Sequence, residues 1–326
     1  MGESPAAPAG AGAPGVGVVG LGTMGGQMAR HLLAAGYRLI GRDAEPGRAA
    51  AVTALGGIAA ASPAEVAAGA GTVILSLPSV AEFEQVIGGT DGLVSGARPG
   101  LAVIETSTLP LPVKERARLL LADRGAVMLD CPISGTGAQI RGKDVVIYAS
   151  GDPATLADVR PVLAAFSRAQ VDLGAFGNGT KLKLVANLLV TIHNVAAAEA
   201  LLLAGRAGLD PRQSLAALTA GAGTSRMLEV RGPLMVAGEY GEASMRVGTF
   251  QKDLDLIAGF ARELGCPAPV FTAAAQVHLA ALAGGRADED TASVFAVLEQ
   301  LAGEPGAASG AAPPSVSSRS QATYDD

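Results

Sequence analysis

A lysine and an asparagine, Lys183 and Asn187, lie four residues apart in a long apolar segment that is predicted to be helical. Residues spaced by four share one face of a helix, whereas Lys181 points elsewhere. Burial disfavours the charged form of an amine and lowers its pKa, which suits a lysine to accept and donate a proton. The alternative is an ordinary lysine whose ammonium extends to solvent, and the spacing alone does not decide between the two.

A glycine-rich turn, Gly20-Leu21-Gly22-Thr23-Met24-Gly25, follows a short apolar run at 16–19 and precedes a helical pattern. In this context the first glycine permits a tight turn and the second lets the backbone approach a pyrophosphate. The third lets helix and strand pack closely. Backbone N–H groups at the helix start can then bind the phosphates. The pattern predicts a dinucleotide site, with an ordinary glycine turn as the alternative.

The residue type at the end of the second predicted strand bears on which dinucleotide is used. Asp43 lies 18 residues after Gly25, where an acid can accept hydrogen bonds from the ribose hydroxyls of NAD. The alternative is a solvated loop aspartate. Arg42 and Arg48 flank it and could instead serve the 2′-phosphate of NADP. The sequence favours NAD, with NADP possible.

Three further polar turns follow predicted strands, at 76–79, 106–108 and 130–138. Ligands lie at the carboxyl ends of strands in such sheets, although each turn could be purely structural. In the last turn, Ser134 and the backbone N–H groups after it could hold a carboxylate. The three histidines have no acid nearby in the sequence and are predicted to be structural. They are His31, His193 and His278.

The order of elements predicts an α/β fold of the Rossmann type, a doubly wound parallel sheet, followed by an all-α C-terminal domain joined to it by a long helix. The predicted strands are 16–19, 38–40, 72–77, 101–105, 127–130 and 144–148, and the helices between them are 25–35, 48–55 and 111–121. The later helices are 180–207, 211–220, 227–237, 250–264 and 272–283. The predicted segments are a disordered 1–14, a dinucleotide-binding domain 15–176, a helical domain 177–302 and a disordered tail 303–326.

Composition limits the classes of function. The 326 residues are 49% hydrophobic and carry a net charge of −6, with no basic run, so no nucleic-acid partner is expected. Two distant cysteines fit neither a metal site nor a disulfide framework, which indicates a reducing, cytoplasmic compartment. Polar residues in the long apolar helix argue against a membrane span. Helices this apolar predict a homodimer or homotetramer.

The chain resembles the β-hydroxyacid dehydrogenase family, the 3-hydroxyisobutyrate dehydrogenase-like enzymes with a nucleotide-binding domain of the 6-phosphogluconate dehydrogenase type. The resemblance covers residues 16–283 and rests on four motifs in order. They are the turn at 20–25, Asp130-Cys131-Pro132-Ile133-Ser134-Gly135, Gly177-x-Gly179-x-x-x-Lys183-x-x-x-Asn187, and Lys252-Asp253-Leu254.

The resemblance implies a role for each motif. Lys183 is the catalytic acid/base, and Asn187 holds the substrate beside it. Thr108 lies near nicotinamide and substrate, and Lys252 reaches the site from the C-terminal domain. The substrate carboxylate is bound by Ser134, Gly135 and Thr136, and the cofactor cleft is lined by Leu77 and Pro78. Ala44, in place of an arginine after Asp43, goes with NAD.

These roles imply an NAD-dependent oxidoreductase that reversibly converts a small 3-hydroxy acid to a semialdehyde or keto acid. Three departures from the family pattern are the short turn Gly135-Thr136-Gly137, Ala186 in place of the first asparagine, and Glu105 before the Ser/Thr motif. The turn bears on the substrate because it meets the carboxylate. Alternatives are an imine reductase-like enzyme, disfavoured by Lys183, and a non-catalytic dinucleotide-binding module.

Overall fold

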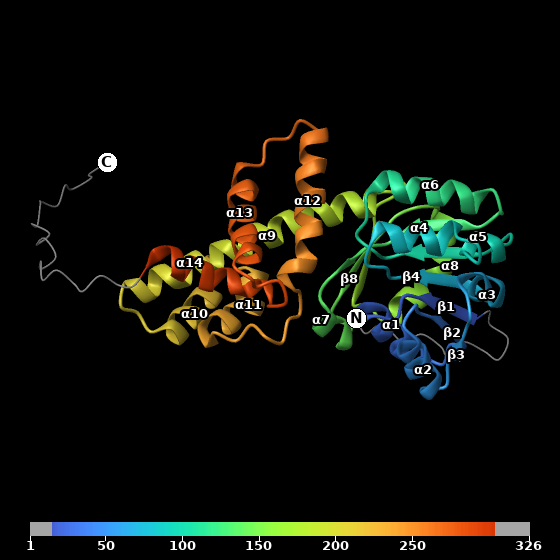
Figure 1. Cartoon of the computed structure of the whole chain (residues 1–326), viewed down its shortest axis with the longest axis horizontal. Helices are drawn as coiled ribbons and strands as arrows, with labels where there is room; N and C mark the ends of the chain where they lie inside the picture. Colours follow the sequence, from blue (N-terminus) through green and yellow to red (C-terminus); the bar gives the residue numbers. More distant parts are fainter. Residues whose placement is uncertain (1–14, 304–326) are drawn as a thin grey trace, which may run out of the picture.

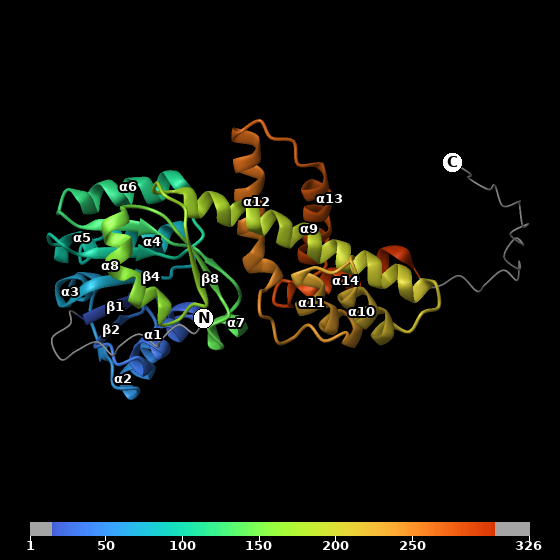
Figure 2. The same ribbon diagram turned by 180° about the vertical axis from the view of Figure 1, so that it is seen from behind.

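The computed structural model describes residues 15–303, and the two segments predicted to be disordered, 1–14 and 303–326, lie outside these residues except for Gly303. The described chain forms a sheet flanked by helices and a separate group of helices, shown in Figures 1 and 2. The helix α9 (Asn178–Arg206) runs from the first part into the second, as predicted.

The sheet confirms the predicted fold class. Its six strands are all parallel, in the order β3-β2-β1-β4-β5-β6. They are β1 (Gly15–Val19), β2 (Leu39–Arg42), β3 (Ile58–Ala59), β4 (Ala70–Leu75), β5 (Ala102–Glu105) and β6 (Val127–Asp130). The chain reverses its direction of winding between β1 and β4, and the crevice at the carboxyl ends of strands there is the place where ligands bind in such sheets.

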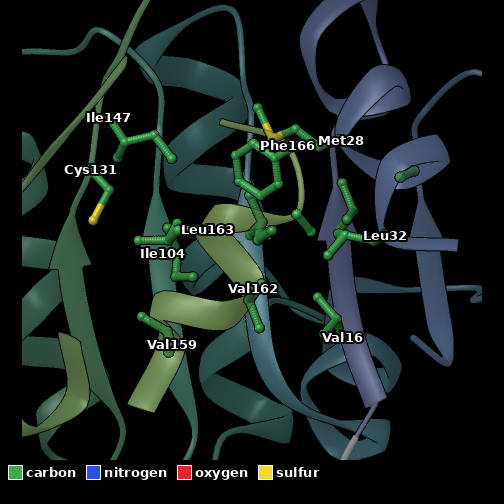
Figure 3. Packing of buried hydrophobic residues seen from close by; sticks show 14 of the residues in the cluster. Val16, Met28, Leu32, Ile104, Cys131, Ile147, Val159, Val162, Leu163 and Phe166 are labelled. Atoms are coloured by element: carbon green, nitrogen blue, oxygen red, sulfur yellow. The ribbon is translucent and has the colours of Figure 1, made fainter. Parts of the chain in front are cut away.

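Helices cover both faces of the sheet, which explains why its strands are apolar rather than alternating. One face packs on α1 (Thr23–Ala34), α2 (Pro46–Ala54) and α8 (Pro153–Ala164). There Met28, Leu32, Val162 and Phe166 are buried, as Figure 3 shows. The other face packs on α3 (Pro63–Gly69), α4 (Val80–Gly88), α5 (Leu93–Gly96) and α6 (Leu111–Ala122). The apolar burial on both faces fixes the carboxyl edge of the sheet.

One predicted strand forms, but it does not belong to the sheet in which it was expected. The run predicted at 144–148 forms β8 (Val146–Ala149), which lies outside the parallel sheet. It pairs antiparallel with β7 (Ile133–Ser134) and parallel with β9 (Ala169–Asp172), in a second sheet of three strands. An apolar run predicts a strand but not its neighbour, because the partner is set by where the intervening turn returns the chain. Elements not predicted are β3, α3, α4, α5, β7, α7 (Gly137–Arg141), α8 and β9.

The second part is helical, as predicted. Around α9 pack α10 (Pro211–Ala220), α11 (Arg226–Ala237), α12 (Val247–Glu263), α13 (Pro269–Ala283) and α14 (Val294–Ala302). The last of these, with the 3₁₀ turn Thr291–Ser293 before it, was not predicted. Among residues 15–303, α9 alone has the length and composition to cross a membrane, but here it is the central helix of this group.

Two glycines of the glycine-rich turn are required by sterics. Gly20 adopts φ +88°, a conformation that residues with a Cβ rarely take. A Cβ on Gly25 would lie 1.8 Å from the carbonyl oxygen of Gly20, so α1 can approach the turn only without a side chain there. This close approach places the start of α1 at the edge of the crevice.

Gly25→Ala should lower both the thermal unfolding temperature and the affinity for NAD, because the helix must move away from the turn. Overpacking of this kind costs about 1–3 kcal/mol. The matched control is Gly259→Ala, at an exposed position in α12 where a Cβ meets no atom within 4 Å. It should stabilise the chain by up to about 1 kcal/mol. Calorimetry and NAD titration measure both, and unchanged NAD affinity in Gly25→Ala would contradict the steric argument.

Candidate active site

A cleft of about 1260 Å³ lies at the carboxyl edge of the parallel sheet and extends to the start of α12. It brings together most of the residues that the sequence singled out, although they are spread over more than 200 positions. The predicted residues that line it are Gly20, Gly22, Thr23, Met24, Asp43, Leu77, Pro78, Thr108, Gly135, Thr136, Lys183 and Lys252. The predicted dinucleotide turn and the candidate acid/base Lys183 therefore line the same cavity.

Four of the predicted site residues do not line the cleft. Leu21 packs in the core, and Gly25 lies against Gly20. Asn187 is buried one turn after Lys183. Ser134 lies in β7, paired with Val146, and its contact with a substrate carboxylate stays a prediction.

The start of α1 fits the pyrophosphate of a dinucleotide. The helix begins at Thr23 with Gly22 as its N-cap residue, and no side chain caps it. A Cβ on Gly22 would meet only the Arg48 guanidinium, at 3.6 Å, so space remains above the turn. The first N–H groups of a helix carry partial positive charge, which favours an anion at this place.

Asp43 is not the solvated loop residue that the sequence left open, because only 7% of it is exposed. Its carboxylate accepts the N–H of Leu21 at 2.6 Å and that of Glu45 at 2.8 Å. Arg48 lies 3.6 Å away. Each carboxylate oxygen has two lone pairs, so acceptor capacity remains for ribose hydroxyls. Asp43 thus holds the glycine-rich turn onto the end of β2 and faces the cleft.

Lys183 and Asn187 lie on one buried face of α9, as the spacing predicted. Burial lowers the pKa of Lys183, and the nearby ammonium of Lys252 lowers it further, whereas Asp253 opposes both. The amide of Asn187 donates a 2.9 Å hydrogen bond to Asp253. Asn187 therefore contacts a carboxylate that lines the cleft and does not line the cleft itself.

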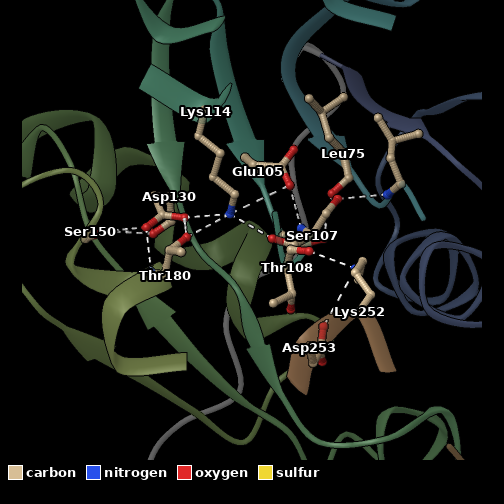
Figure 4. Close-up of polar contacts among 12 residues, drawn as sticks. Leu75, Glu105, Ser107, Thr108, Lys114, Asp130, Ser150, Thr180, Lys252 and Asp253 are labelled. Carbon is tan, nitrogen blue, oxygen red and sulfur yellow. Dashed lines mark hydrogen bonds and ion pairs between the residues drawn. The ribbon is translucent and has the colours of Figure 1, made fainter. Parts of the chain in front are cut away.

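Asp253 was missed as a site residue although its motif was recognised, because the sequence pointed only to the neighbouring lysine. It lines the cleft, and burial raises the pKa of its carboxyl group. Lys252, 3.8 Å from Asp253, reaches across the cleft and donates a 2.8 Å hydrogen bond to the carbonyl of Thr108, as Figure 4 shows. This contact connects the helical part to the loop after β5.

The short turn after β7 has a structural reason for its threonine. The Thr136 hydroxyl accepts the N–H of Gln139, and the Gln139 side chain accepts the N–H of Thr136, a capping box that starts α7. A Cβ on Gly137 would lie 2.4 Å from the methyl group of Thr23. The predicted substrate turn therefore packs directly on the dinucleotide turn.

Known proteins share this arrangement. Residues 15–177 match the NAD binding domain of 6-phosphogluconate dehydrogenase, and residues 177–298 match the NAD-binding domain of NADP-dependent 3-hydroxyisobutyrate dehydrogenase. The chain belongs to the β-hydroxyacid dehydrogenase family. As a member of it, the chain is an NAD(P)-binding oxidoreductase.

Individual relatives match over nearly their whole length. An L-threonate dehydrogenase of Cupriavidus necator is 34% identical over 87% of this chain and 95% of its own length. An L-threonate dehydrogenase of Escherichia coli K12 is 31% identical over 88% and 95%. The crystal structure of a 3-hydroxyisobutyrate dehydrogenase from Salmonella typhimurium is 33% identical, with a TM-score of 0.78, over 86% of this chain and 99% of that one.

This β-hydroxyacid dehydrogenase carries a buried acid beneath its cleft. Glu105, at the end of β5, is fully buried, and burial raises its pKa to about 7. One of its oxygens accepts the N–H of Ser107 at 2.6 Å and lies 3.9 Å from the Lys114 ammonium. The other has no hydrogen-bond partner among the described residues. Ionised Glu105 is therefore incompletely compensated.

The free energy of unfolding should reflect this. Because the pKa of Glu105 rises from 4.5 to about 7 on folding, its contribution to stability is fully present below pH 4.5 and is lost as pH rises through 7. Glu105→Gln should therefore gain stability relative to the wild type between pH 5 and pH 8. Urea unfolding of both proteins at pH 5 and at pH 8 measures this gain. A stability difference between them that is the same at both pH values would contradict the raised pKa of Glu105.

Proposed function

We propose that the chain catalyses the reversible, NAD-dependent oxidation of a small 3-hydroxy acid to a semialdehyde or keto acid. The observation that carries this proposal is Lys183. Its amine is buried, its pKa is lowered, and it lines the same cleft as the dinucleotide turn. A neutral amine in a cleft with a hydride acceptor is suited to alcohol oxidation.

Each residue has a distinct role in the proposed reaction. The turn at 20–25 and Asp43 would hold the pyrophosphate and a ribose of the dinucleotide, whose nicotinamide would supply the hydride acceptor. Lys183 accepts the proton of the substrate hydroxyl and returns it in the reverse direction. Asp253, oriented by Asn187, stabilises the ammonium that forms. Lys252 bonds the carbonyl of Thr108 and so holds α12 against the loop after β5.

The substrate class rests on two supports. The named relatives act on threonate or 3-hydroxyisobutyrate, both small hydroxy acids. The turn at 135–137 lines the same cleft as Lys183, and its N–H groups other than that of Thr136, which the Gln139 side chain accepts, are candidates to bind a carboxylate. Lys252 adds positive charge to this cleft. The buried acid Asp43, followed by Ala44, supports NAD over NADP.

The alternatives are weaker. Lys183, with its lowered pKa, disfavours both an imine reductase-like activity and a non-catalytic dinucleotide-binding module. A homodimer or homotetramer stays a prediction, supported by the exposed apolar side chains of Val185, Leu189 and Leu203 on α9. The cytoplasmic location and the domain boundaries also stay predictions.

Lys183→Ala should retain NAD affinity and lose about 10²- to 10⁴-fold in turnover, the usual contribution of a general acid/base. Lys181→Ala is the matched control, since Lys181 is an exposed lysine on the same helix whose amine bonds only Asn178 in this structure. The rate of oxidation in the wild type should rise with pH through the lowered pKa of Lys183. Near-normal turnover in Lys183→Ala would refute the role.

A panel of hydroxy acids tests the substrate class. L-threonate, 3-hydroxyisobutyrate, glycerate and 3-hydroxybutyrate are each assayed with NAD and with NADP by absorbance at the nicotinamide band. We expect at least one acid to be oxidised, with a higher kcat/KM for NAD. Reduction of cyclic imines without oxidation of any acid would favour the imine reductase alternative.

A further inference from the structure

We infer that Lys114 is a positioning residue, which anchors the first turn of α9 on the sheet and so fixes Lys183 in the cleft. The inference rests on the proposed role of Lys183. Lys114 comes from α6, does not line the cleft, and belongs to none of the four motifs in the sequence.

The start of α9 lacks a cap of its own. Gly177, its N-cap residue, adopts φ +92° and has no side chain, so the first N–H groups of the helix need partners from elsewhere. The N–H of Gly179 donates to the Ser150 hydroxyl at 2.9 Å, and the N–H of Thr180 donates to Asp130 at 2.7 Å. Two residues at the carboxyl ends of strands therefore cap the helix.

The helix can accept these partners only because it lies directly on the strands. A Cβ on Gly179 would be 2.4 Å from the carbonyl oxygen of Tyr148 and 2.7 Å from that of Asp130. The glycine thus brings the positive end of the helix against the Asp130 carboxylate, an arrangement that the helix dipole favours.

Lys114 makes this buried carboxylate tolerable. Its ammonium and the Asp130 carboxylate are both fully buried and lie 2.8 Å apart. A buried charge of this kind is costly unless it is paired and hydrogen-bonded. The ammonium also donates to the Thr180 hydroxyl at 2.9 Å, and that hydroxyl donates to Asp130 at 2.7 Å. Lys114, Asp130 and Thr180 form a closed triangle, visible in Figure 4.

The same ammonium bonds a residue that lines the cleft. It donates its third hydrogen bond, 2.7 Å long, to the carbonyl of Ser107, next to Thr108. Thr180 lies three residues before Lys183, so the triangle is one helical turn from the acid/base. Lys114 therefore sets the distance between Lys183 and the loop that receives Lys252. A misplacement of about 1 Å at such a site can cost 10²-fold in rate.

The decisive variant is Lys114→Met, which keeps the apolar stem and removes the charge. We expect kcat to fall at least about tenfold while the Kd for NAD stays within about twofold, because the dinucleotide turn is not part of the triangle. Hydrogen exchange should accelerate at the amides of 179–183 but not in the rest of α9. Unchanged kcat and unchanged exchange at 179–183 would overturn the inference.

Two further variants separate positioning from general loss of stability. Leu201→Ala removes a buried side chain from the same helix, eighteen residues after Lys183, and should lower the unfolding temperature without lowering kcat. An equal fall in kcat there would count against a specific role of Lys114. The double variant Lys114→Met/Asp130→Asn removes both charges and so leaves no unpaired buried carboxylate. The asparagine amide oxygen can still accept the N–H of Thr180. It should slow exchange at 179–183 again.

If Lys114→Met does not fold, the double variant carries the test: folding with protected 179–183 amides supports the inference, and folding with unprotected ones overturns it. If the wild type oxidises no hydroxy acid, the proposed function fails, but the exchange measurement still decides whether Lys114 anchors α9.

Discussion

The capping of α9 by the sheet is the interaction on which the site depends. The helix α9, whose N-cap residue is Gly177, begins against the ends of β6 and β8. Two of its first N–H groups, which have no partner within the helix, donate to Ser150 and Asp130. The carboxylate is retained in the interior because Lys114 lies against it. The position of Lys183 is thereby set by the ends of β6 and β8 rather than by the packing of the helical part alone.

A second contact joins the helical part to the loop after β5, at the residue next to the one that Lys114 bonds. Lys252 in α12 bonds to the loop after β5, and Asp253 beside it receives the amide of Asn187 from α9. Two helices of the second part are thus tied to each other and to the edge of the sheet within one short stretch of α12. Movement between the two parts of the chain would have to break the contact at Thr108.

The sequence predicted the elements better than their pairing. Apolar periodicity located most strands and the long helices within a few residues, but it placed β8 in the wrong sheet because pairing depends on the path of the turn before it. The glycine motif, Asp43 and Lys183 were found because each carries a local chemical pattern. Lys114 and Asp253 were not, since their importance comes from partners 16 to 66 residues away in sequence, and only the fold brings these together.

Two buried lysines in one protein illustrate why burial alone does not define an acid/base. Lys114 has three hydrogen-bond acceptors, one of them a carboxylate at 2.8 Å, so its charge is compensated and structural. Lys183 forms no ion pair within 4 Å among the described residues, feels a second ammonium at Lys252, and lines the cleft. The first environment pairs the ammonium with a buried carboxylate, whereas burial in the second lowers the pKa of the Lys183 amine. Thr180, which contacts Lys114, lies three residues before Lys183, so one turn of α9 carries both a partner of the structural lysine and the proposed acid/base.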